Sequence, residues 1–160
     1  MLGRSYDNLD CSVARALEAI GERWTILILR DAFFGVRRFD DFQKDLGIAR
    51  NVLQTRLTHL VDEGIMERVP YQERPVRHEY KLTQKGIDLW PVIIAMLGWG
   101  DRYEASPGGP PTRLFHRECG GEVTDRGICG ECGQVLTARD VRRVLRADLA
   151  VERGVASVGA

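Results

Sequence analysis

The sequence predicts an α+β fold, with a group of helices, a β-hairpin and a small cysteine-containing module in that order. Three observations predict it. Residues 12–64 hold successive segments with apolar side chains at helical spacing, each ended by a glycine. Residues 65–83 then alternate apolar and polar side chains, as β-strands do. Three of the chain's four cysteines lie within residues 119–132.

The composition is typical of one main domain with a small appendage. The chain has 160 residues, 44% of them hydrophobic, which is enough to bury one sizeable core. Its 23 basic and 23 acidic side chains cancel, so any binding to nucleic acid must come from a local patch. The N-terminus carries no basic-then-apolar signal sequence, and "WPVIIAMLGWG" is too short to cross a bilayer. We therefore expect a cytoplasmic protein without a membrane partner.

The N-terminal half predicts four helices. In "CSVARALEAIG" the apolar residues lie at helical spacing, and Asp10 or Ser12 can cap the start. "RWTILILRDAFFG" is apolar almost all round, which indicates a central buried helix. A short helix capped at Asp40 or Asp41 ends at a glycine turn, and a longer helix follows that turn.

The second half begins with the hairpin. "IMERVPYQERPVRHEYKLT" alternates around a proline-containing turn. Thr83 then caps one final helix over "QKGIDLWPVIIAMLGWGDRY", whose apolar residues occupy more than one side and so favour a partner helix. The proline-rich "ASPGGPPT" has the composition of a stiff linker. These elements divide the chain into a main domain at 1–104, a linker at 105–111, a module at 112–148 and a tail at 149–160.

The order helix, helix, short helix, tight turn, helix, hairpin is that of a winged helix-turn-helix. In that fold the helix after the turn enters the DNA major groove and the hairpin lies beside it. On a helical wheel, the leucines of "ARNVLQTRLTHLVDE" lie on one side and the polar groups on the other. Arginine suits guanine, asparagine and glutamine suit adenine, and the threonine methyl suits thymine. The predicted base-contacting residues are Arg50, Asn51, Gln54, Thr55 and Thr58.

An ordinary polar helix face is the alternative for these five residues, although the turn and the hairpin around them disfavour it. At the hairpin tip, Arg74 and Arg77 are predicted to contact the minor groove or phosphates. Arg56 falls within the apolar arc instead, so we expect it to pair with an acid inside the domain, with Asp31 as the candidate.

The cysteine module has the spacing H-x2-C-x9-C-x2-C, with a glycine turn after each half. Two close pairs of thiolate and imidazole ligands suit tetrahedral zinc, and four protein ligands make the site structural, not catalytic. Reduced thiols without metal are the alternative. With few apolar residues, the module is not expected to fold without its zinc. The predicted ligands are His116, Cys119, Cys129 and Cys132.

Residues 11–99 resemble the HxlR-type transcriptional regulators, relatives of the MarR group. "GERWTILILRDAFFGVRRF", "ARNVLQTRL" and "YKLTQKG" carry the resemblance, and the "HxxCG…CxxCG" tail is similar to that of many such proteins. It implies a homodimer built from the first and last helices, bound to a two-fold operator in double-stranded DNA. It also implies that Arg50, Asn51, Gln54 and Thr55 lie on the recognition helix. A serine is usual in the family where this chain has Ala49.

Cys11 matches the N-terminal cysteine with which redox-sensing members of that family detect quinones or oxidants. A thiol switch is therefore one hypothesis for it. The alternative, which we favour, is a small residue buried in the dimer interface.

The sequence thus predicts a sequence-specific, homodimeric DNA-binding regulator that responds to a small-molecule effector or an oxidant. The alternative is a general transcription factor that joins a winged helix to a zinc ribbon and binds polymerase without sequence preference, as archaeal TFE-like factors do. An enzyme is not expected. No Cys-x-x-Cys lies outside the cluster, no glycine-rich phosphate loop appears, and His59 and His78 lack a catalytic context.

Overall fold

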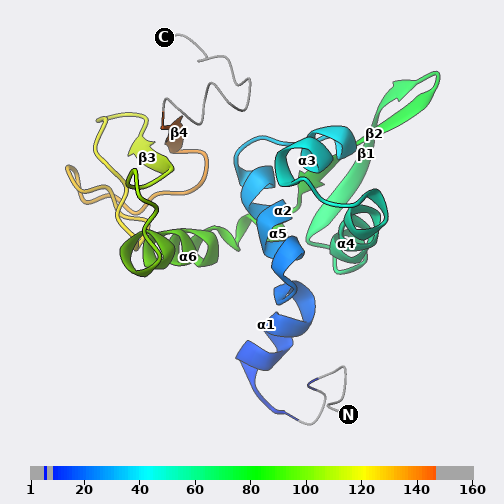
Figure 1. The fold of residues 1–160 in the computed structure, drawn as a ribbon, viewed down its shortest axis with the longest axis horizontal. Helices are drawn as coiled ribbons and strands as arrows, with labels where there is room; N and C mark the ends of the chain where they lie inside the picture. Colours follow the sequence, from blue (N-terminus) through cyan, green and yellow to red (C-terminus); the bar gives the residue numbers. More distant parts are fainter. Residues whose placement is uncertain (1–5, 7–8, 147–160) are drawn as a thin grey trace. The chain divides into compact units, whose positions relative to one another are not determined.

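The computed structural model describes residue 6 and residues 9–146 (Figure 1). Two compact units divide between Ile87 and Asp88. The first unit holds α1 (Ser12–Ile20), α2 (Arg23–Phe33), α3 (Phe39–Leu46), α4 (Arg50–Asp62), β1 (Met66–Glu73), β2 (Val76–Leu82) and α5 (Gln84–Ile87). The second holds α6 (Trp90–Tyr103), β3 (Thr112–His116) and β4 (Val141–Leu145). The α+β winged helix-turn-helix and the C-terminal hairpin with its cysteine cluster are as predicted. No helix in the described part of the chain could span a membrane.

The core of the first unit lies between α2, α3 and α4. Ile28 and Leu29 of α2 are fully buried, as are Phe42 of α3 and Leu53 and Leu57 of α4. The helical spacing of these apolar residues is what the sequence pattern required, because each helix must bury one stripe of side chains. This packing fixes which side of α4 remains outside.

The turn between α3 and α4 is held by Gly47. This residue has φ of 61°, in the left-handed region that favours glycine, and its N–H donates to Gln43. Ile48, next in the chain, is buried. The predicted tight turn is therefore confirmed. Helix α4 begins at Arg50, and its N-cap Ala49 offers no side-chain hydrogen bond.

The predicted caps of α1 and α3 are wrong. The N-cap of α1 is Cys11, and the carboxylate of Asp10 bonds to Arg15 instead of to the backbone of the helix. The N-cap of α3 is Arg38, and its two acids lie in the first turn. There their charge complements the helix dipole, which stabilises the helix without a capping hydrogen bond.

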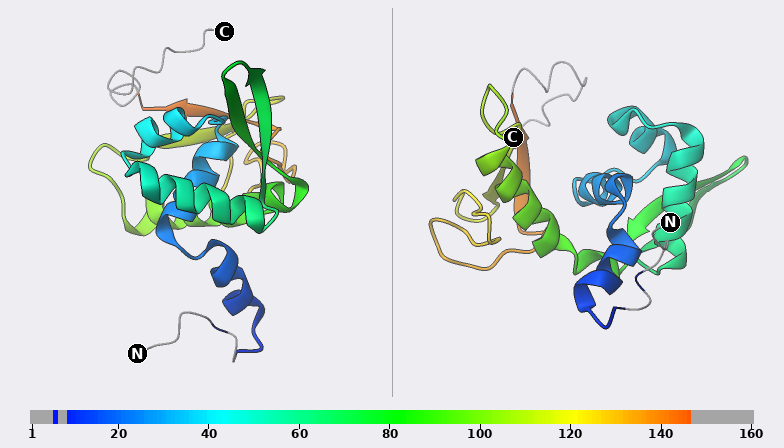
Figure 2. Two further views of the ribbon diagram at one scale, coloured as in Figure 1. Left: turned by 90° about the vertical axis from the view of Figure 1, so that its right-hand side faces the viewer. Right: turned by 60° about the horizontal axis from the view of Figure 1, so that its bottom comes forward.

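The wing is an antiparallel hairpin of β1 and β2, with an irregular register between Pro70 and Gln72. Only the base of this hairpin is buried. Met66 and Tyr80 near the base are buried, whereas Glu73 and Val76 beside the turn are exposed. The tip consequently extends beyond α3 and α4 (Figure 2).

The last predicted helix is two helices. Thr83 caps α5 as expected, because its Oγ1 accepts from the Gly86 N–H at 3.3 Å. The break follows at Pro91, which lies in the first turn of α6. In one continuous helix the Pro91 ring would clash with the carbonyl of Ile87, so α6 starts afresh at Trp90.

In the second unit, α6 packs on the cysteine module. The indole Nε1 of Trp90 donates to the Leu136 carbonyl at 3.1 Å, and Arg102 pairs with Asp125 at 2.6 Å. The two compact units divide before α6, and the predicted domain boundaries after residues 104 and 111 stay predictions. That α6 also serves the first unit as a dimerisation helix stays a prediction, and the predicted tail at 149–160 lies outside the described residues.

Gly98 allows α6 to approach the module closely. A Cβ added there would lie 2.2 Å from the Cβ of Asp125, whereas one at Gly100 would meet nothing within 4 Å. We expect Gly98→Ala to destabilise the second unit by about 1–3 kcal/mol through overpacking. Gly100→Ala, the matched control, should stabilise it by about 0.5–1 kcal/mol. Urea unfolding, monitored through hydrogen exchange of residues 88–146, measures the stability change of each variant. Equal stability of the two variants would contradict the close contact between Gly98 and Asp125.

Candidate nucleic-acid interface and metal centre

One side of α4 is polar and faces outward. Leu53, Leu57 and Leu60 are fully buried against the core, so the opposite side of the helix must face solvent. The five predicted base-contacting residues are all exposed there: Arg50, Asn51, Gln54, Thr55 and Thr58. We call these five side chains the recognition face.

Some side chains of the recognition face are held and others are free. Gln54 Nε2 donates to Thr58 Oγ1 at 3.2 Å, and Thr55 Oγ1 donates to the Asn51 carbonyl at 2.9 Å. Arg50 lies 3.6 Å from Asp40 Oδ1, and both side chains are exposed. Within the described residues, the side-chain amide of Asn51 has no polar partner. Asn51 can therefore donate to and accept from a base without breaking an internal bond.

A groove separates the N-terminal half of α4 from the wing. Its volume is about 410 Å³, and Arg50, Gln54 and Arg77 are among the residues that line it. The structure thus brings predicted residues of the helix and of the wing to one surface. Arg38, the N-cap of α3, and Arg68 of β1 also line the groove. Both were missed from the sequence, because the local pattern does not show how the start of α3 and the sides of β1 are placed against α4.

Two other arginines from the sequence analysis, Arg74 and Arg56, do not line the groove. Arg74 lies at the wing tip and is exposed, but it does not line the groove. The acid beside Arg56 is Glu22, at 3.6 Å, not the predicted Asp31, which pairs with Arg30 at 2.6 Å. Glu22 precedes α2, and its carboxylate also caps that helix by accepting from the N–H of Trp24. Arg56 is therefore a structural residue, as expected, with a different partner.

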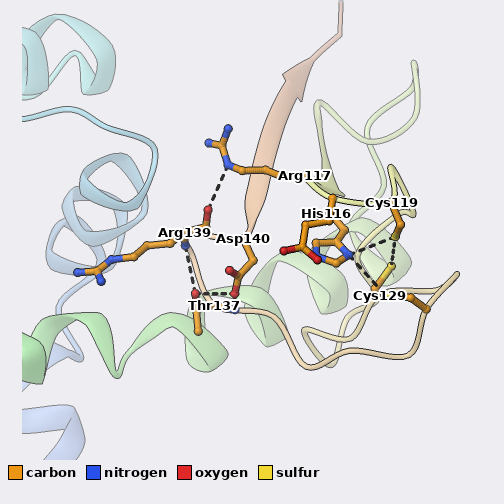
Figure 3. Close-up of polar contacts among 9 residues, drawn as sticks. His116, Arg117, Cys119, Cys129, Thr137, Arg139 and Asp140 are labelled. Carbon is orange, nitrogen blue, oxygen red and sulfur yellow. Dashed lines mark hydrogen bonds and ion pairs between the residues drawn. The ribbon is translucent and has the colours of Figure 1, made fainter.

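The four predicted metal ligands converge in the second unit, and Figure 3 labels three of them, His116, Cys119 and Cys129. One donor atom from each lies within 4.8 Å of the other three. Nδ1 of His116 is 3.1 Å from the sulfur of Cys119 and 3.4 Å from that of Cys132, and the sulfurs of Cys119 and Cys129 are 3.3 Å apart. Tetrahedral zinc with Zn–S of 2.3 Å needs sulfurs about 3.8 Å apart. Small outward movements of the four donors would therefore accommodate the ion.

The backbone around the cluster suits thiolates. The N–H of Cys132, with help from that of Glu131, lowers the pKa of Cys129 to about 6 against the effect of burial. The N–H of Gly121 likewise lowers the pKa of Cys119, but contacts with neighbouring thiols and burial outweigh it and leave that pKa raised. A Cβ on Gly121 would lie 2.5 Å from the Cys129 sulfur. This glycine is therefore required for the close approach of backbone to ligand.

His116 is oriented for ligation through Nδ1. The residue is 1% exposed, and its Nε2 has no hydrogen-bond partner among the described residues. The nearest acid is Glu118, whose carboxylate lies 3.9 Å from Nε2. With Nδ1 on a metal, Nε2 carries the ring proton and Glu118 can orient it, which is the usual arrangement around a metal-bound imidazole. The donor set fits zinc.

Residues 19–107 match the family described as HxlR-like helix-turn-helix. This chain belongs to the HxlR-like family. The HTH-type transcriptional regulator Rv3095 of Mycobacterium tuberculosis is 53% identical over 130 residues, which are 81% of this chain and 82% of the relative. Members of this family are transcriptional regulators that bind DNA through the helix-turn-helix, and not enzymes.

Solved structures of similar chains match this chain over different shares of its length. PA1607, a candidate transcription factor, is 42% identical, and the match covers 88% of this chain and 97% of PA1607 with a TM-score of 0.68. The redox regulator HypR in its oxidized form is 31% identical, and the match covers 57% of this chain and 96% of HypR with a TM-score of 0.54. The HxlR-like chain is therefore similar to HypR over 57% of its length and to PA1607 over 88%.

Two further residues of this HxlR-like chain concern α1: Cys11 at its start, and His59, which joins its end to the recognition helix. Cys11 is exposed at the N-cap of α1. His59 of α4 donates from Nε2 to the carbonyl of Ala19, in the last turn of α1, at 2.9 Å. No local sequence pattern indicates this bond, since it joins residues 40 positions apart. It ties the recognition helix directly to the first helix.

Proposed function

We propose that this chain is a sequence-specific regulator that acts as a homodimer on a two-fold operator in double-stranded DNA. The observation that carries the proposal is the recognition face, whose five polar side chains are all exposed on the helix that follows the Gly47 turn. The groove beside it is lined by more basic than acidic side chains and so carries positive charge next to the recognition face: Arg38, Arg50, Arg68 and Arg77 against Asp40 and Asp41. This combination suits base contacts from α4 and phosphate contacts from its surroundings. A regulator of this kind works in the cytoplasm.

Exposed apolar stripes support the homodimer. On α6, four large apolar side chains recur at helical spacing and are 41–62% exposed: Val92, Met96, Trp99 and Tyr103. On α1, Val13 and Leu17 are 67% and 46% exposed. Side chains of this size are costly to leave in water, at roughly 25 cal/mol per Å² of apolar surface. A second copy of the chain that covers them would recover this free energy.

We also propose a structural zinc ion in the cluster of His116, Cys119, Cys129 and Cys132. Four protein ligands would complete its coordination, so it would supply folding free energy to the module and no chemistry. The buried His116 ring and the glycine cradle at Gly121 support this assignment.

Selection of binding sites from random DNA tests the regulator proposal. The full chain is expected to enrich a palindrome whose half-sites are centred about one helical turn apart. A general transcription factor that binds polymerase would enrich none. Absence of any enriched sequence, with the protein shown to be folded and zinc-loaded, would overturn the proposal in favour of that alternative.

Cys11, for which the sequence favoured a buried place in the dimer interface, is exposed in the single chain, and we propose it as a thiol switch of DNA binding. Its exposure at the N-cap of α1 and the His59 bond from α4 to α1 support a route from thiol to recognition face, and the similar HypR is a redox regulator. We expect mild oxidant to weaken operator binding by the wild type and not by Cys11→Ser. Unchanged affinity in both proteins would leave Cys11 as an interface residue. The small-molecule effector, if distinct from an oxidant, stays a prediction from the sequence.

A further inference from the structure

The hairpin of β3 and β4 has an outward side that neither the zinc cluster nor α6 explains. In its register Phe115 is opposite Arg142, and Arg113 is opposite Val144. Their neighbours Leu114, His116 and Val141 are buried, so alternation turns these four residues outward. Arg117 follows β3 in the same alternation and is exposed. We call Arg113, Phe115, Arg117 and Arg142 the ribbon face.

Two guanidinium groups lie over the ring of Phe115. The Cζ atoms of Arg113 and Arg142 lie 5.3 Å and 5.0 Å from the centre of its ring. Stacking on an aromatic ring orders an arginine side chain while leaving its N–H groups free to donate. The ordering lowers the entropy that these side chains would lose when they bind an anion.

The ribbon face carries more positive charge than its own acids neutralise. Glu122 accepts from Arg113 Nε at 2.7 Å and compensates that residue. Arg142 has no carboxylate partner within the described residues, nor does Arg117, whose Nε donates to the Arg139 carbonyl at 3.1 Å (Figure 3). Asp140, opposite Arg117, directs its carboxylate to the Thr137 hydroxyl at 2.7 Å. Two uncompensated cations therefore remain on an exposed sheet surface.

Two arginines without a carboxylate partner, Arg142 over the Phe115 ring and Arg117 on the Arg139 carbonyl, are complementary to a phosphodiester backbone. Arginine is suited to phosphate because its planar fork of donors matches the phosphate oxygens. When α4 is bound to DNA, the ribbon face is tethered to the same duplex because the two units belong to one chain, so a second contact would be intramolecular. Even a weak phosphate contact would add affinity under that condition.

We propose that the ribbon face contacts DNA phosphates outside the base pairs that the recognition face selects. This inference rests on the proposed function. It adds a second, sequence-independent contact surface to the regulator and assigns a role to the cysteine module beyond stabilising itself. An acidic protein segment is the competing partner for such a surface, and the experiment below separates the two.

The test is the salt dependence of binding by the full chain. Arg117→Gln with Arg142→Gln is compared with the wild type on the selected palindrome, both trimmed and extended by about one helical turn on each side. Each phosphate contact contributes about 0.9 to the slope of log Kd against log salt concentration. We expect the double variant to lose about 2 units of slope per protomer on the extended DNA and none on the trimmed DNA. Arg126→Gln, also exposed in the module but outside the ribbon face, is the matched control and should keep the full slope.

Each outcome decides. Zinc content equal to that of the wild type shows that the variant module is folded. Equal slopes of wild type and double variant on extended DNA overturn the ribbon-face inference and leave the regulator proposal intact. If the slopes are equal and the double variant loses binding to an acidic protein segment, that segment is the partner of the ribbon face instead of DNA. Failure of the wild type to select any sequence overturns the proposed function, and the inference with it.

Discussion

Removal of zinc from the full chain is expected to unfold residues 112–146 while α2, α3 and α4 keep their helices. Apart from α6, the apolar core of the module is small, with Leu114, Leu136 and Val141 as its buried aliphatic residues. Loops with few apolar contacts cannot offset their ordering entropy. In small zinc modules the metal supplies about 10–16 kcal/mol of apparent binding free energy, which becomes folding free energy. Hydrogen exchange before and after chelation measures the loss segment by segment.

A pair of cysteine variants controls for the chelator. Cys129→Ser removes a buried ligand of the cluster and should release zinc, whereas Cys11→Ser removes an exposed thiol outside it and should retain the metal. Because Trp90 and Arg102 contact the module, amides of α6 should also exchange faster after chelation. Full protection of residues 112–146 in metal-free protein would contradict a zinc-dependent module.

Loss of one side chain on the recognition face is expected to reduce specificity sharply. Asn51→Ala removes an exposed amide that has no polar partner within the described residues, so the fold should keep its stability. A bidentate contact to adenine contributes about 1–3 kcal/mol of discrimination, which is roughly a fivefold to 150-fold loss of affinity per half-site. Titration of the variant against the selected palindrome and against unrelated DNA measures this loss.

Binding to unrelated DNA is the internal control for that variant. Its affinity and salt dependence should match those of the wild type, because phosphate contacts from the wing and the groove are untouched. An equal loss on all sequences would show that Asn51 contributes to general affinity and not to the choice of bases.

Local chemistry explains why much of the fold could be predicted from the sequence. A left-handed turn at Gly47 and buried leucines on one side of α4 follow from residue type and spacing alone. The metal cluster is similar, since two close pairs of ligands with glycine turns leave few other arrangements. The predictions of the helix caps were wrong because an acid near the start of a helix can form its hydrogen bond elsewhere, as Asp10 does with Arg15.

Features that depend on packing between distant segments were not predictable. The Glu22 partner of Arg56 and the bond from His59 to Ala19 join different helices. The contact of α6 with the module at Gly98 depends on how two segments pack, not on the periodicity of either. The break before α6 could have been found, because Pro91 cannot follow a continuous helical turn.

A footprint of the full chain on its selected operator shows whether two recognition faces act together on one duplex. We predict two protected major-groove patches related by two-fold symmetry and centred about 10 base pairs, or roughly 34 Å, apart. Asn51→Ala should remove base protection in both patches and leave backbone protection. A single patch without symmetry, or protection that Asn51→Ala does not alter, would contradict it.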